Sequence, residues 1–133
     1  MPKPRKNWTD DQPGARTAMT VIYHNPRCSK SRQTLELLRE NEVEPEIVEY
    51  LKTPPSAADL KAILGKLGLS ASQILRRKET RDAGIDPAAL SEDDLVAAIA
   101  ANPVIMERPI VVSGERAVLG RPPENVLALI QAG

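Results

Sequence analysis

The stretch from Val21 to Ser31 constrains the fold of this chain more than any other. A short apolar run ends in a polar turn that carries a proline, and the only cysteine of the chain, Cys28, lies at that turn. The residues that follow have the pattern of an amphipathic helix. A cysteine at a strand-to-helix turn faces the first backbone N–H groups of the helix, and these donors favour the thiolate over the thiol. The stretch therefore predicts an activated nucleophile or an anion site with a sulfur at its centre.

The composition limits the class of protein. A chain of 133 residues favours a single domain with one core. It carries 18 basic and 18 acidic residues, and this balance argues against a general binder of nucleic acid or of a membrane surface. No apolar run has the length of a transmembrane helix. One cysteine cannot form an internal disulfide, so nothing indicates an oxidising compartment, and we expect the protein in the cytoplasm.

The first 18 residues differ from the rest of the chain. They are rich in proline and in charged residues, and they contain no apolar segment of the kind that a secretory signal requires. We expect residues 1–18 to form a disordered leader and residues 19–133 to form the domain.

The order of the predicted elements indicates the fold class. β-Branched runs predict strands, and apolar positions with a spacing of three and four predict helices. Residues 79–89 are polar and are predicted to be irregular. The expected strands cover residues 20–23, 46–51, 110–112 and 116–119, and the expected helices cover 29–41, 56–66, 70–78, a segment after 91 and a segment that contains 126–130.

This order is β-α-β, a helical insert, then β-β-α. It predicts an α/β (α+β) fold of the thioredoxin-like type, with a four-stranded mixed sheet and a helical insert between strands 2 and 3. Such a fold places a cysteine at the start of its first helix. It also places a proline, often cis, before the third strand and close to that cysteine, and Pro109 has this position.

Three arginines lie at the ends of predicted elements, where they could meet Cys28. They are Arg76, Arg108 and Arg121. The guanidinium group binds tetrahedral oxyanions through two parallel hydrogen bonds and does not lose its proton, so the three together suit a multiply charged oxyanion. Their charge would also lower the pKa of the thiol.

Two polar residues flank the cysteine. His24 could bond the loop or the thiolate, and Ser31 could satisfy the first-turn backbone donors or touch the thiolate. The sequence has no cluster of histidines and cysteines, so we predict no metal site.

Several separated motifs resemble the glutaredoxin-coupled arsenate reductase family, in its arsenate reductase-like branch. The resemblance covers nearly the whole domain, from about residue 19 to residue 130, and its motifs follow the order of that family. They are Tyr23–Arg32, Asn102-Pro103, Glu107–Val112 and Gly120–Glu124.

The resemblance implies a role for each site residue. Cys28 matches the nucleophile that attacks arsenate, and His24 matches a histidine that helps to activate it. Arg76, Arg108 and Arg121 match the arginines that bind the oxyanion. Glutathione would then attack the arsenic, and glutaredoxin would complete the reduction to arsenite, with no bound cofactor. Because the chain has no second cysteine, an external thiol is required in any case.

Two alternatives remain open at this point. The family also contains redox-sensing regulators that bind transcription machinery, but these typically carry Cys-x-x-Cys where this chain has Cys28-x-x-Ser31. A monothiol, glutathione-dependent oxidoreductase with another substrate is the second alternative. Around the first arginine the family usually reads Leu-Leu-Arg-Lys, so Arg76 is in register, while Arg77 could take its role.

Overall fold

A four-stranded mixed sheet lies at the centre of the molecule. The computed structural model describes residues 20–131, so the predicted leader lies outside the described residues and the domain boundaries stay a prediction. The strand order is β2-β1-β3-β4, with β1 parallel to β2 and antiparallel to β3, and β3 antiparallel to β4. The predicted fold class is confirmed. The strands are β1 (Thr20–His24), β2 (Glu46–Glu49), β3 (Ile110–Ser113) and β4 (Arg116–Leu119).

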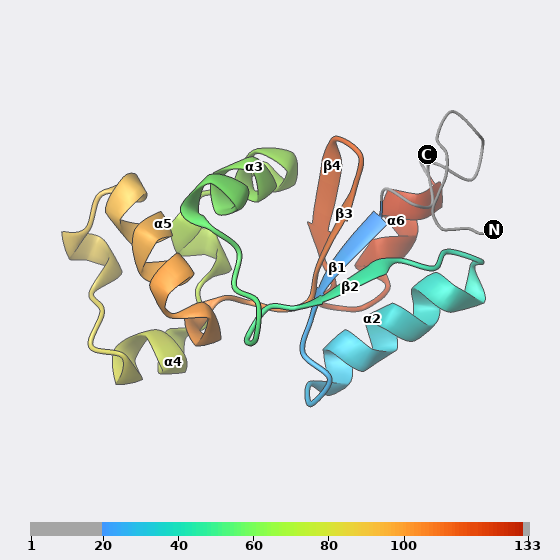
Figure 1. Cartoon of the computed structure of the whole chain (residues 1–133), viewed down its shortest axis with the longest axis horizontal. Coiled ribbons are helices and arrows are strands. Elements are labelled where there is room, and N and C mark those ends of the chain that lie inside the picture. The colour runs from blue at the N-terminus through green and yellow to red at the C-terminus, as the bar shows by residue number, and fades with distance from the viewer. Residues whose placement is uncertain (1–19, 132–133) are drawn as a thin grey trace.

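Two helices cover one face of the sheet, on the right in Figure 1. They are α2 (Ser29–Glu40) and α6 (Asn125–Gln131), which contact each other. Their apolar side chains pack against alternate residues of the strands, as expected for a strand with one side chain on each face in turn. The buried residues of this layer are Ile22, Leu38, Val111, Val126 and Leu129.

The helical insert packs on the other side and extends to the left in Figure 1. It contains α3 (Ala57–Leu67), α4 (Arg77–Asp82), α5 (Glu92–Ala101) and three short 3₁₀ segments at residues 71–74, 87–89 and 103–105. Helix α3 contacts both α5 and β4, so the insert and the sheet share one apolar core. None of the helices within residues 20–131 has the length and apolar character needed to cross a membrane.

The ends of α3 follow the expected capping chemistry. The hydroxyl of Ser56 accepts a hydrogen bond of 3.1 Å from the backbone N–H of Asp59, and the Asp59 side chain returns to the N–H of Ser56. Gly68 ends the helix with a φ of 71°, a conformation that glycine adopts without steric cost.

Three predictions about the elements are wrong. The helix expected over 70–78 is instead a 3₁₀ turn, two extended residues and then α4, because Leu75 pairs in a β-bridge with Met106. Part of the region expected to be irregular therefore belongs to α4 and to the 3₁₀ turn at 87–89. Strand β2 also ends at Glu49, since its carbonyl accepts hydrogen bonds of 2.9 Å from the N–H groups of Lys52 and Thr53 and turns the chain.

Candidate active site

Cys28 is the residue at which the β1–α2 loop becomes helix. It is the N-cap of α2, with extended backbone angles, and its side chain is partly exposed. The loop before it is folded on itself, because the N–H of Cys28 donates to the carbonyl of Asn25 at 3.0 Å and the N–H of Arg27 donates to Oδ1 of Asn25 at 3.0 Å. Asn25 thus holds the turn that presents the sulfur.

The surroundings of Cys28 favour the thiolate. Burial alone would raise the pKa of Cys28. The backbone N–H groups of Ser31 and Lys30 and the guanidinium of Arg108 outweigh burial, and the pKa lies below its ordinary value. The first turn of α2 contains no acidic residue that would cancel the positive end of the helix. The structure therefore brings Arg108 to the sulfur, as the sequence predicts.

His24, the last residue of β1, contacts the side chain of Ser31. Its Nδ1 is 2.6 Å from Oγ of the fully buried Ser31, and that hydroxyl accepts the N–H of Asn25 at 3.0 Å. Burial is the main effect that lowers the pKa of His24, with Glu49 acting in the opposite direction. This arrangement fits a neutral imidazole whose Nδ1 accepts a hydrogen bond from the Ser31 hydroxyl. In the part of the chain that the structure describes, no hydrogen bond joins His24 to Cys28. Its predicted role as an activator of the cysteine is therefore untested.

Arg76 and Arg121 are brought together by a carboxylate. Oε1 of Glu107 lies 4.0 Å from Nε of Arg76 and 3.7 Å from Nε of Arg121. Arg121 also donates from Nη1 to the carbonyl of Arg108 at 3.2 Å, and Arg76 pairs with Glu79 at 3.0 Å. The three predicted arginines thus form one group around the segment 107–108.

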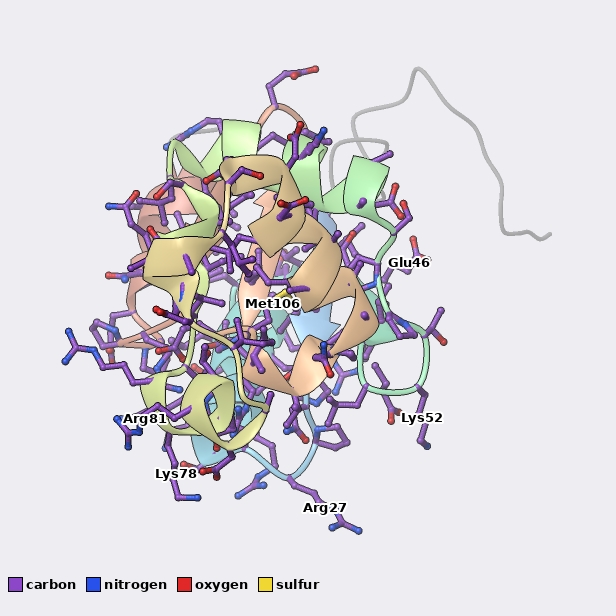
Figure 2. The ribbon with its side chains drawn as sticks, turned by 90° about the vertical axis from the view of Figure 1, so that its left-hand side faces the viewer. Arg27, Glu46, Lys52, Lys78, Arg81 and Met106 are labelled. Carbon is purple, nitrogen blue, oxygen red and sulfur yellow. The ribbon has the colours of Figure 1, made fainter. Side chains whose placement is uncertain are left out.

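The β-bridge explains how Arg76 reaches this group. The N–H of Arg76 donates to the carbonyl of Ile105, and the N–H of Glu107 donates to the carbonyl of Ile74, both at 2.7 Å. Met106, labelled in Figure 2, is fully buried, and its bridge partner Leu75 is half-buried. Arg77 is exposed in the first turn of α4. Of the two candidates that the sequence left open, Arg76 is the one that faces the site.

Pro109 links the arginine group to α2. The peptide bond from Arg108 to Pro109 is cis, as expected, and the buried ring packs near Gly120. The N–H of Gly120 donates to the carbonyl of Pro109 at 2.9 Å. A Cβ atom on Gly120 would lie 2.6 Å from Oγ1 of Thr34 and 2.8 Å from Cγ of Pro109, so only glycine fits between them.

Sequence reasoning missed that Glu107 and Tyr50 lie near Arg108. Glu107 appeared only as a letter in a motif, although its position next to Arg108 was a signal that it lies at the site. The sequence predicts Tyr50 within a strand, but it directly follows β2, which runs parallel to β1. Because parallel strands end at the same edge of a sheet, Tyr50 and the loop after β1 lie near each other.

Comparison with known proteins agrees with this arrangement. Residues 23–129 match the ArsC family. The chain belongs to this family. Membership in this family accounts for both the confirmed fold and the order of the motifs.

The match to similar proteins extends over almost the whole length of each of them. The uncharacterized protein YfgD of Escherichia coli K12 is 51% identical over 117 residues, which are 86% of this chain and 98% of that protein. An arsenate reductase of Neisseria meningitidis serogroup B is 47% identical over 112 residues, or 82% of this chain and 96% of that protein.

Solved structures show the same fold. The arsenate reductase from Vibrio cholerae superposes with a TM-score of 0.78 at 46% identity, covering 83% of this chain and 97% of that one. The putative arsenate reductase from Yersinia pestis superposes with a TM-score of 0.77 at 49% identity, covering 81% and 97%. In this ArsC protein, residues 20–131 contain no cluster of three or more side chains that could hold a metal ion.

Proposed function

We propose that this protein reduces arsenate to arsenite through a covalent intermediate on Cys28, with glutathione and glutaredoxin as the source of electrons. The observation that carries the proposal is the position of Cys28, whose sulfur is stabilised as a thiolate by the first N–H groups of α2 and by Arg108. Relatives at 47% identity that are named arsenate reductases support this substrate.

The arginine group supplies the charge that an oxyanion requires. Arsenate is a tetrahedral anion, and the planar fork of a guanidinium donates two parallel hydrogen bonds to two of its oxygens. Arg108 faces the sulfur, so it can hold arsenate with the arsenic atom within reach of Cys28. Arg76 and Arg121, which meet at Glu107, would complete the binding.

The first step is a substitution without a change of oxidation state. The thiolate of Cys28 attacks arsenic, a sulfur–arsenic bond forms, and one arsenate oxygen leaves as water after taking up protons. Arg108 serves this step twice, because its charge both lowers the pKa of the thiol and stabilises the negative oxygens during attack.

The reduction needs two thiols from outside the chain. The first, glutathione, attacks the arsenic bound to Cys28, and glutaredoxin provides the thiol chemistry that completes the reduction. In the net reaction, arsenate and two thiols give arsenite, one disulfide and one water, so arsenic gains the two electrons that the thiols lose. The single cysteine of the chain supports this route, because no internal disulfide can take those electrons.

The test is arsenate-dependent oxidation of NADPH in an assay coupled through glutathione reductase, with glutathione and glutaredoxin present. Wild type should turn over, and Cys28→Ser, which keeps the fold but offers a poorer nucleophile, should not. Omission of glutaredoxin or of glutathione should each reduce the rate. Wild-type turnover that survives in Cys28→Ser would eliminate the proposed nucleophile. NADPH oxidation with a glutathione mixed disulfide, and none with arsenate, would favour a monothiol oxidoreductase instead.

A further inference from the structure

Two buried hydrogen-bond donors near Cys28 lack a partner. Tyr50 is fully buried, and among residues 20–131 its hydroxyl finds no hydrogen-bond partner. Nε of Arg108 is likewise buried without an acceptor. Buried polar groups in proteins are nearly always hydrogen-bonded, so each exception calls for an explanation. Within the described residues a third buried atom, Oε1 of Glu107, also forms no hydrogen bond, although it lies 4.0 and 3.7 Å from the Nε atoms of Arg76 and Arg121. The other two atoms are donors that this oxygen does not reach, so the group that would satisfy both is an acceptor from outside the chain.

The hydroxyl of Tyr50 lies near two of the three arginines that are proposed to bind the oxyanion. Burial raises the pKa of Tyr50, while Arg108, Arg76 and Asn25 act in the opposite direction because they lie close to the hydroxyl. Arg108 is also the guanidinium that stabilises the thiolate of Cys28. Tyr50 therefore adjoins Arg108, Arg76 and the loop that presents the sulfur, and with its pKa raised it remains a donor at neutral pH.

Packing of the ring does not by itself explain why this residue is a tyrosine. The ring packs in the apolar core with side chains of α3 and α5. A phenylalanine would fill the same volume without burying a polar atom. The hydroxyl thus adds nothing to the packing, and its nearness to Arg108 and Arg76 indicates a ligand.

We propose that the hydroxyl of Tyr50 donates a hydrogen bond to an oxygen of the tetrahedral oxyanion bound beside Cys28, next to the donor Nε of Arg108. This inference rests on the proposed oxyanion site, but it does not depend on which oxyanion is reduced. Arsenate and phosphate have the same charge and nearly the same shape, so inorganic phosphate is a suitable non-reducible probe. Tyr50 would be a substrate-binding residue that adds a directed contact and no charge.

The test compares Tyr50→Phe with wild type in two measurements, thermal unfolding of the free protein and titration with inorganic phosphate. We expect the melting temperature of the free variant to equal or exceed that of wild type, and the Kd for phosphate to rise about tenfold. The KM for arsenate should rise by a similar factor. The matched control is Tyr23→Phe, because Tyr23 is the other tyrosine and has Asp59 and Glu46 as its charged neighbours. That control should leave the Kd unchanged.

Several outcomes would overturn the inference. An unchanged Kd for phosphate in Tyr50→Phe is one. A raised Kd together with a lower melting temperature of the free variant is another, because it would show that the hydroxyl supports the fold. A wild type that binds no phosphate is the third.

The inference and the proposed function can fail separately. If wild type binds phosphate through Tyr50 but does not reduce arsenate, the proposed function falls and this inference holds. If Tyr50→Phe reduces arsenate with the wild-type KM, the proposed function holds and this inference falls.

Discussion

Oε1 of Glu107 lies 3.7 Å from Nε of Arg121. The same oxygen lies 4.0 Å from Nε of Arg76, so two of the three proposed oxyanion ligands share one carboxylate. The third, Arg108, follows Glu107 directly in the chain, but its guanidinium stabilises the thiolate of Cys28. Part of the positive charge near the nucleophile is therefore balanced within the protein before any anion binds.

The first prediction concerns this balance. Glu107→Gln keeps the size of the side chain and removes its charge, so Arg76 and Arg121 no longer share their charge with a carboxylate. We expect the Kd for phosphate to fall about two- to fivefold, the range that ion pairs of this exposure support. The measurement is a phosphate titration at constant ionic strength. A rise in Kd would show instead that Glu107 chiefly positions the two guanidinium groups.

The second prediction separates Arg76 from its neighbour. Arg76→Met should raise the KM for arsenate about tenfold or more, because a charged hydrogen bond to the oxyanion is lost. Arg77→Met removes an equal charge one residue away, on an exposed part of α4, and should change the KM less than about twofold. Steady-state kinetics of the two variants decide the matter. Equal effects would mean that general electrostatic attraction, and not a specific contact, accounts for the role of Arg76.

The third prediction concerns the ionisation of Cys28. Its rate of alkylation by iodoacetamide should rise with pH around a midpoint below the ordinary cysteine value, since the N–H groups of Ser31 and Lys30 and the Arg108 guanidinium outweigh burial. Arg108→Lys should move this midpoint upward, because an ammonium cannot reproduce the fork of the guanidinium. An unmoved midpoint would leave the helix N–H groups as the cause of the lowered pKa.

The lowered pKa also links the stability of the fold to pH. The pKa of Cys28 is lower in the folded protein than in the unfolded chain, so ionisation adds stability that is fully present above the unfolded value of about 8.5. This contribution is lost as the pH falls through the folded value. The melting temperature of wild type relative to Cys28→Ser should therefore increase with pH over that window. A constant difference would contradict the pKa shift.

The fifth prediction concerns the close packing at Gly120. Gly120→Ala should lower the free energy of unfolding by about 1–3 kcal/mol, because the new methyl group would overlap Thr34 and Pro109. Gly65→Ala is a matched control inside α3, where nothing lies within 4 Å of the added Cβ, and it should stabilise the protein by about 0.5–1 kcal/mol. Urea denaturation measures both changes. A neutral Gly120→Ala would mean that this contact relaxes freely.

Hydrophobic spacing predicted most of the elements but not α4. β1, β3 and β4 are short runs rich in β-branched or apolar residues, and α3 has the apolar positions and the capping serine that signal a helix. Helix α4 (Arg77–Asp82) contains only polar residues, so periodicity offers no signal for it. Its contacts appear only in the folded chain: the hydroxyl of buried Thr80 donates to the carbonyl of Arg76, and Lys78 pairs with Asp82 at 2.8 Å.

The site was predictable where a single segment carries it. The position of Cys28 follows from one strand-to-helix turn, and the nearness of Arg108 follows from the fold that this turn implies. Glu107 and Tyr50 depend on contacts between distant segments, which no local pattern contains. Tyr50 in particular belongs to the expected strand 46–51, so its hydroxyl is significant only once its neighbours are known.

The bridge between Leu75 and Met106 also bears on how this chain tolerates changes in length. The chain leaves the bridge after Leu75, forms α4 and α5, and returns to the same pair of hydrogen bonds at Met106. The outer turn of this excursion, around residues 82–84, is exposed. Insertions or deletions there lengthen or shorten a segment whose two ends are held together by the hydrogen bonds of the bridge. The excursion can therefore diverge among related chains while Arg76 and Glu107 keep their places.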